Sequence, residues 1–318
     1  MKDGYWKRMS AIIIGLILVS ALMVSQAFAW GSATHAYIDD HLGRKAPLRN
    51  LNEIYGGMAP DVFNFLFGNP AMAYLYTVTH YQAYPDDYLN VWDKSHTFLA
   101  KAVSFGFVSH NGDFGADHTA HHESLYLKTS QGYVIEKANV LGSYLKLEEL
   151  IPGLPDAVYK ELYHDLIEFA LDIMITQKDK HLAAKISSAA MLRTPDFPLL
   201  LVRAYAKGLA QQKFQGIDYP TAVKLILQSE NEFRKTMISY GQALMQDQET
   251  AIDLIAQQLV DLAKAFLGEL PGPEEQFLQL ARYGLSLSMQ ICSSDFYFEL
   301  AETIKFVSDG LASNGISY

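Results

Sequence analysis

The sequence predicts an all-α protein built from many helices, and three observations support this prediction. Apolar residues recur at helical spacing along most of the chain, clearly from Asp156 to Thr176 and again throughout residues 181–318. Clusters of proline and glycine, such as residues 151–155 and 268–273, separate these segments as helix breaks do. No segment shows the alternation expected of a strand, and 50% of the 318 residues are hydrophobic, which is enough for a large core.

Residues 1–29 have the organisation of a secretory signal peptide. Lys7 and Arg8 supply the positive region, residues 11–24 the apolar segment, and Ala27-Phe28-Ala29 the small-x-small cleavage site. The alternative is an uncleaved membrane anchor, for which this apolar segment is short. We therefore expect cleavage after Ala29 and a protein that is secreted or periplasmic.

The charge of the mature chain argues against a nucleic-acid partner. Cleavage removes three of the 25 basic residues and one of the 35 acidic residues, which leaves a net charge of −12. A surface that binds a polyanion needs an excess of basic side chains. Nucleic acid is therefore disfavoured as a partner, whereas bound zinc would return positive charge locally, where a phosphate must sit.

The densest run of chemically active side chains lies in residues 109–123, which contain four of the ten histidines and three carboxylates. If this run forms one helix, four of these side chains fall on one narrow stripe: His110, Asp113, Asp117 and His121. Imidazole nitrogens and carboxylate oxygens on one face suit Zn²⁺ better than Ca²⁺. The alternative is a solvated polar face or a few hydrogen-bonded core histidines. Metal is favoured because an apolar run precedes this stretch, and buried acids need a compensating cation.

Further candidate ligands precede this run. Cleavage exposes the α-amino group of Trp30, which can chelate a metal together with its own carbonyl oxygen, and His35 can complete such a site. Asp61 follows a turn, where it either caps a helix or binds metal. Of His80 and His96, one is expected to be a ligand and the other a structural or surface residue.

The predicted helix that begins at Asp156 offers two more ligands. His164 and Glu168 are spaced i, i+4 and therefore lie one turn apart on one face. A surface ion pair is the alternative explanation of this spacing. No histidine follows His181, so we divide the chain into a signal peptide (1–29), a zinc-binding catalytic domain (30–180) and a helical C-terminal extension (181–318).

Taken in their order along the chain, these residues resemble the zinc-dependent phospholipase C family, which is related to the single-strand-specific fungal nucleases. The resemblance covers residues 30–170, and residues 181–318 show no match to the family. It implies an all-α fold, a mature N-terminal tryptophan and three clustered zinc ions.

The resemblance also assigns the candidate residues to three zinc ions. The first ion would be held by Trp30 and His35, and the second by Asp61, His80 and His110. The third would be held by His121, His164 and Glu168, with Asp117 as the bridging carboxylate. Asp61 is also the family's usual candidate for activating water.

The bridging carboxylate departs from the family's usual spacing, which is His-x3-Asp. This chain offers two choices after His110, namely His110-x2-Asp113 and His110-x6-Asp117. Asp117 is preferred because Gly115-Ala116-Asp117-x-x-Ala120-His121 resembles the Ala-Asp-x-x-Ala-His run of bacterial members. The additional residues 111–113 are then expected to form a local bulge.

The resemblance implies a secreted zinc-dependent phosphoesterase that hydrolyses phospholipid head-group esters with zinc-activated water. Contact with a membrane surface belongs to the same hypothesis. A 3′-nucleotidase or single-strand nuclease is the first alternative, which the Trp30-Gly31-x-x-x-His35 opening favours and the negative charge disfavours. The second alternative is a non-catalytic secreted protein in which closed zinc sites hold the helices together.

Overall fold

A computed structural model describes residues 30–318 except for residues 67, 84, 213–215, 268, 269 and 271. The described residues are 76% helical and contain no strand, which confirms the predicted all-α fold. A single isolated β-bridge joins Ser124 to Thr129. The predicted signal peptide, residues 1–29, lies outside the described residues.

The helices follow one another with short connections. In chain order they are α2 (Ser32–Leu42), α3 (Pro47–Met58), the 3-10 helix η1 (Ala59–Leu66), α4 (Ala71–His80), α5 (Leu89–Asp93), α6 (Phe98–His110), α7 (Ala116–His121), α8 (Tyr133–Leu145), α9 (Leu147–Leu150), α10 (Asp156–Lys178), α11 (Leu182–Leu192), α12 (Phe197–Gln211), α13 (Tyr219–Leu244), α14 (Gln248–Leu267), α15 (Glu274–Cys292) and α16 (Phe296–Ser313).

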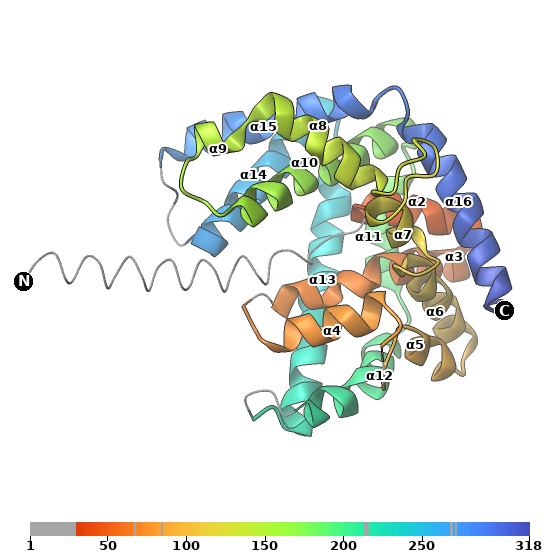
Figure 1. The fold of residues 1–318 in the computed structure, drawn as a ribbon. Coiled ribbons are helices and arrows are strands. Elements are labelled where there is room, and N and C mark those ends of the chain that lie inside the picture. The colour runs from red at the N-terminus through yellow and green to blue at the C-terminus, as the bar shows by residue number, and fades with distance from the viewer. Residues whose placement is uncertain (1–29, 67, 84, 213–215, 268–269, 271) are drawn as a thin grey trace, which may run out of the picture.

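The long helix α13 runs through the middle of the molecule (Figure 1). In this view α8, α10, α14 and α15, which pack against one another, lie around its upper part, and α4, α5 and α12 lie around its lower part. Helix α16 follows the outer edge and contacts α2, α6 and α7. The N-terminal helices are therefore surrounded by helices from later in the chain.

The close approach of α3 and α6 depends on glycine. A Cβ atom at Gly106 would lie 2.0 Å from the carbonyl oxygen of Glu53, and one at Gly56 would lie 2.0 Å from that of Val103. The two backbones are therefore in direct contact, which a larger side chain would prevent. Because η1 follows α3 directly and His110 is the last residue of α6, this contact brings the end of α6 close to η1.

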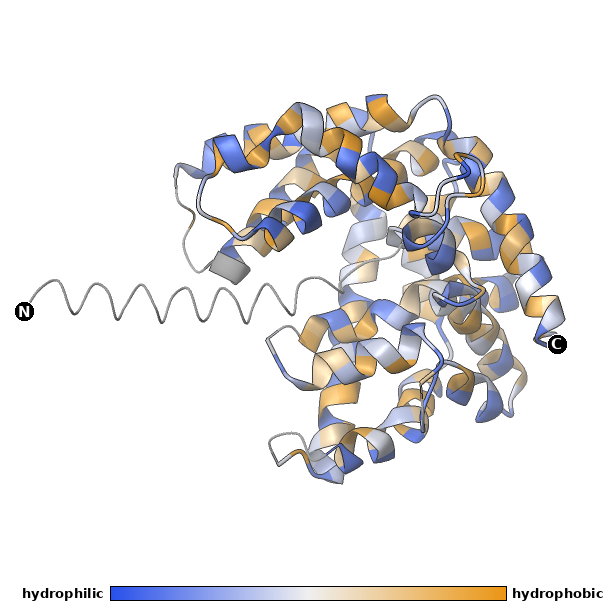
Figure 2. Cartoon of the chain, in the orientation of Figure 1, coloured by the Kyte–Doolittle hydropathy of each residue, from blue (hydrophilic) through white to orange (hydrophobic). Residues whose placement is uncertain are grey.

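One hydrophobic core joins the predicted catalytic domain to the predicted C-terminal extension. The buried indole of Trp30 stacks on Tyr133 with ring centroids 5.5 Å apart, and it lies 6.1 Å from Phe296 of α16. Figure 2 shows hydrophobic and hydrophilic residues alternating around single helices such as α16, as expected of amphipathic helices that cover a core. Helices from residues 181–318 thus complete the core around Trp30.

Residues 109–123 do not form the single helix considered above. Helix α6 ends at His110, and α7 begins at Ala116. Between them, Oδ1 of Asn111 accepts hydrogen bonds from the backbone N–H groups of Asp113 (2.8 Å), Phe114 (2.8 Å) and Gly115 (3.2 Å). The condition for one continuous stripe is therefore not met, because this side chain binds the N–H groups that a continuing helix would use.

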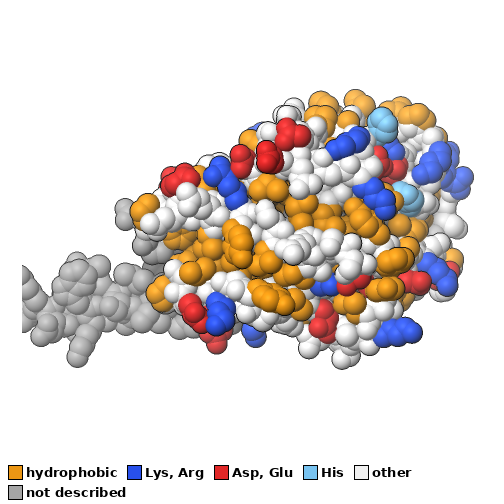
Figure 3. Space-filling model, turned by 90° about the horizontal axis from the view of Figure 1, so that it is seen from above, with side chains coloured by type: hydrophobic (Ala, Val, Ile, Leu, Met, Phe, Trp, Pro, Cys, Tyr) orange, Lys and Arg blue, Asp and Glu red, His pale blue; other side chains and the backbone are white. Residues whose placement is uncertain are grey.

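The surface carries several large hydrophobic side chains. Figure 3 shows hydrophobic side chains grouped between charged ones on the upper face. Tyr126 and Phe298 are both exposed, and their rings stack 5.1 Å apart. Among the described helices, none combines the length and the hydropathy needed to cross a bilayer.

Candidate metal centre

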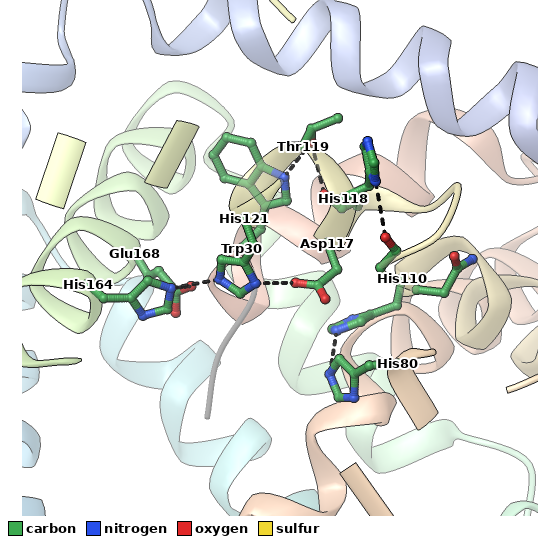
Figure 4. A network of polar contacts seen from close by, with 12 residues as sticks. Trp30, His80, His110, Asp117, His118, Thr119, His121, His164 and Glu168 are labelled. Carbon is green, nitrogen blue, oxygen red and sulfur yellow. Dashed lines mark hydrogen bonds and ion pairs between the residues drawn. The ribbon is translucent and has the colours of Figure 1, made fainter. Parts of the chain in front are cut away.

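The predicted side-chain ligands converge on one place in the interior, and Figure 4 shows most of them in one network. They come from α2 (His35), η1 (Asp61), the last residues of α4 (His80) and α6 (His110), α7 (Asp117, His121) and α10 (His164, Glu168). All of them are buried except His121, whose side chain is 14% exposed. Segments far apart in the chain therefore contribute to one polar cluster.

Asp61, His80 and His110 form a first group that can hold a metal ion. Nε2 of His80 lies 3.4 Å from Oδ1 of Asp61 and 3.2 Å from Nε2 of His110. Nδ1 of His80 contacts the carbonyl oxygen of Tyr76 at 3.0 Å, and Nδ1 of His110 contacts that of Gly57 at 2.7 Å. A carbonyl oxygen only accepts, so both protons sit on Nδ1 and the two Nε2 lone pairs face each other.

Two lone pairs at this distance repel each other unless a cation lies near both. Burial lowers the pKa of His110, which keeps this ring neutral. Burial also lowers the pKa of His80, but the carboxylates of Asp61 and Asp117 raise it above its usual value overall. A shared metal ion, or a proton in its absence, therefore relieves the contact between these two imidazoles.

His121, His164 and Glu168 form a second group. Nε2 of His164 lies 2.8 Å from Nε2 of His121 and 3.2 Å from Oε1 of Glu168. Burial lowers the pKa of His164, and it raises the pKa of Glu168 well above its usual value, with Asp165 and Asp61 adding to the effect. Glu168 therefore favours its protonated form when no cation is bound, and a metal ion between these three side chains would stabilise its charged form.

Asp117 lies between the two groups. Its Oδ1 is 2.9 Å from Nδ1 of His121, and the carboxylate is fully buried. Burial raises the pKa of Asp117, but His121, His80 and His110 together lower it far below its usual value. The carboxylate is therefore ionised and interacts with imidazoles of both groups, as expected of a bridging ligand.

His35 completes the cluster on the α2 side. Its ring stacks on that of His110 with centroids 3.8 Å apart and an interplanar angle of 12°. Neither ring nitrogen has a hydrogen-bond partner among the described residues, although the side chain is only 1% exposed. Burial, together with His110, lowers the pKa of His35 well below its usual value, so this ring is a neutral imidazole available to a metal ion.

Trp30 is fixed beside α7 by its indole group. Nε1 donates a hydrogen bond to Oγ1 of Thr119 (3.0 Å), which lies between Asp117 and His121 in the chain. The start of α2 is held by Asp172 of α10, which accepts hydrogen bonds from the backbone N–H groups of Ala33 (2.7 Å) and Thr34 (2.8 Å). The main chain at Trp30 is thereby anchored next to the cluster, as Figure 4 shows.

The structure also separates the alternatives that the sequence left open. Asp113 is exposed and accepts hydrogen bonds from Gln82 N–H and the Tyr88 hydroxyl, both at 2.9 Å. His96 is exposed, whereas His80 is fully buried in the first group. The cluster therefore contains Asp117 and His80, while Asp113 and His96 lie outside it.

Some contributing residues were not identified from the sequence. Asp165 and Glu161 flank His164 on α10 and form a further group with it. Their spacing of i, i+3 and i+4 with His164 was a visible signal, because such residues share a helix face. The carbonyl oxygen of Gly57 orients His110, and that of Tyr76 orients His80. No pattern in the sequence indicated these contacts.

An open pocket of about 380 Å³ lies beside α7. It is lined by His118, His122, Glu123, Leu125, Lys128, Thr129 and Ser130. His118 faces away from the cluster, since Nδ1 contacts the carbonyl oxygen of Gly112 and the ring stacks on Phe306. Helix α7 therefore directs Asp117 and His121 towards the cluster and His118 towards the pocket, which His122 also lines directly after the helix.

Comparison of the chain with protein-family models, curated proteins and solved structures finds no match. The buried cluster is thus interpreted from the chemistry of its own residues. Its imidazole and carboxylate groups can bind a metal ion.

Proposed function

We propose that the protein is a secreted or periplasmic zinc-dependent phosphoric ester hydrolase of the phospholipase C type. The observation that carries this proposal is the pair of three-ligand groups on either side of the buried Asp117. A carboxylate shared by two such groups would hold two metal ions close together. Two-metal sites are typical of hydrolases of phosphate esters, in which the ions activate water and stabilise the attacking and leaving oxygens.

Zinc fits the donors and their spacing. Histidine nitrogens bind zinc at about 2.0–2.1 Å, so two of them on one tetrahedral ion lie about 3.3 Å apart. The Nε2 atoms of His80 and His110 are 3.2 Å apart, and those of His121 and His164 are 2.8 Å apart. Mixed nitrogen and carboxylate ligands are also typical of zinc rather than of calcium or magnesium.

The chain's own residues prepare such a site for hydrolysis. Bound zinc would lower the pKa of coordinated water to about 7 and offset charge on the phosphoryl group. Asp61 would orient or deprotonate the attacking water, and Nδ2 of Asn64 donates a hydrogen bond to its Oδ1 (3.1 Å), which fixes the carboxylate. Substrate would approach at His121, because this ligand is the one with an exposed edge.

Phospholipid is the proposed substrate class, with contact at a membrane surface. The net charge of −12 for the mature chain opposes a nucleic-acid polyanion. The stacked, exposed rings of Tyr126 and Phe298 lie on the segment after α7 and on α16, and both elements adjoin the cluster. Aromatic side chains of this kind partition into the interfacial region of a bilayer.

The test is substrate hydrolysis by the processed protein, beginning at Trp30 and loaded with zinc. We expect release of the phosphorylated head group from phosphatidylcholine vesicles, at a rate above that for single-stranded DNA or a 3′-nucleotide. The Asp61→Asn variant should lose about 10²–10⁴-fold in kcat, whereas the exposed control His96→Ala should keep the wild-type rate. Faster cleavage of single-stranded DNA than of phosphatidylcholine would establish the nuclease alternative. Zinc binding without hydrolysis of any of these substrates would establish a structural role for zinc.

A further inference from the structure

Helix α10 carries a second set of metal-ligating groups on the far side of His164. Ligand atoms of Glu161, His164 and Asp165 lie within 4.8 Å of one another. The positions are spaced i, i+3 and i+4, so the three side chains occupy one face of the helix. This group shares His164 with the second group of the cluster but uses two carboxylates that have no role in it.

The two nitrogens of His164 face in different directions. Nε2 faces His121 and Glu168, as described above. Nδ1 lies 3.8 Å from Oδ1 of Asp165. Neither Nδ1 nor this oxygen has a hydrogen-bond partner among the described residues, although His164 is 5% and Asp165 6% exposed. Buried polar atoms without partners are rare and costly, so a ligand between them is expected.

The separation of these atoms suits a shared ion better than a hydrogen bond. A distance of 3.8 Å is too long for a hydrogen bond between nitrogen and oxygen. Two ligands that each bind one ion at about 2.0–2.2 Å lie about 3–4 Å apart. Glu161 is only partly buried, so the group also has a route by which an ion can enter.

Charge on this face of α10 supports the same conclusion. Asp165, Glu168 and Asp172 are all buried, and Glu161 lies on the same face of the helix. One divalent cation at the second group would not offset the charge of all four carboxylates. A further cation at Asp165 and Glu161 would offset the remainder.

We propose that Glu161, Asp165 and Nδ1 of His164 bind a further zinc ion, so that His164 bridges two ions as an imidazolate. The proposal rests on the proposed zinc cluster, because it requires Nε2 to be occupied as well. Binding at Nδ1 displaces the proton of this nitrogen to solvent, and the two carboxylates then balance the charge of the added ion. The site adds about one ion to the three that the cluster would hold.

Metal content after equilibrium dialysis against buffered free zinc tests the proposal. We expect about four zinc ions per chain in the processed wild type and about three in Asp165→Asn and in Glu161→Gln. The matched control is Asp156→Asn, which changes an exposed carboxylate on the same helix and should keep the wild-type count. If Asp165→Asn does not fold, the zinc content of Glu161→Gln tests the proposal, because Glu161 is partly exposed and its replacement disturbs the core less.

The outcomes distinguish this proposal from the proposed function. Three ions in the wild type and no change in either variant would overturn the additional site and leave the catalytic cluster standing. A folded wild type without zinc would overturn both. Nitrogen NMR of histidine-labelled wild type gives a second readout, in which His164 should carry no ring N–H at saturating zinc. A persistent Nδ1–H signal would refute the bridge.

Discussion

Replacing Gly106 by alanine tests how the fold positions the metal ligands. The new Cβ would lie 2.0 Å from O of Glu53 and 2.7 Å from N of Gly57, whereas ordinary contacts begin at 3.4 Å. Both neighbours are backbone atoms, which cannot rotate away, so α3 and α6 must separate by about 1 Å or more. Such overpacking costs about 1–3 kcal/mol. The gain in helix propensity, about 1 kcal/mol at most, offsets only part of it.

Thermal unfolding and zinc titration measure the two consequences. A net cost of about 1–2 kcal/mol, at about 2–4 °C per kcal/mol, should lower the melting temperature by roughly 2–8 °C. Zinc affinity should fall too, because Gly57 orients His110 and metal ligands tolerate displacements of only about 0.2 Å. Gly272→Ala is the control, since its Cβ would meet nothing nearer than 3.6 Å. Wild-type stability and affinity in Gly106→Ala would refute the reasoning.

Two further substitutions probe buried groups near the cluster. Burial raises the pKa of Asp39 well above its usual value, despite the hydrogen bond from Ser109. The folded protein therefore holds a proton that the unfolded chain releases above about pH 4, and stability falls as the pH rises from there towards the folded pKa. Asp39→Asn should flatten this decline in urea unfolding between pH 5 and pH 8, and a wild-type slope would contradict the assignment. Trp30→Ala should lose about 3–5 kcal/mol of unfolding free energy, because the indole is fully buried. Trp30→Phe should retain most of the packing and lose about 1 kcal/mol with the hydrogen bond to Thr119; equal losses in the two variants would show that packing contributes little.

Helix formation and the chemistry of the ligands were predictable because both depend on residues that are close together in the sequence. The spacing of His164 and Glu168 needs only a helix to bring the two side chains together, and α10 extends from Asp156 to Lys178, close to its predicted limits. Imidazoles and carboxylates concentrated within residues 109–123 indicated a polar cluster in an otherwise apolar segment.

The choices that the sequence left open depend on tertiary contacts. His80 joins the cluster because it is the buried last residue of α4, whereas His96 lies exposed between α5 and α6. Local periodicity carries no information about which of the two is buried. An interruption was expected at residues 111–113, but its extent to Gly115 was not, because it depends on one side chain, Asn111, which binds three backbone N–H groups. The support that Asp172 gives to the start of α2 joins segments about 140 residues apart, as its hydrogen bond to Ala33 shows (|i−j| = 139).

Anomalous scattering at the zinc edge, from crystals of the processed and zinc-loaded protein, tests the central claim most directly. Peaks are predicted between Asp61, His80 and His110 and between His121, His164 and Glu168, with Asp117 touching both. Bound zinc found only at surface histidines such as His96 and His181, with these two positions empty, would contradict the account.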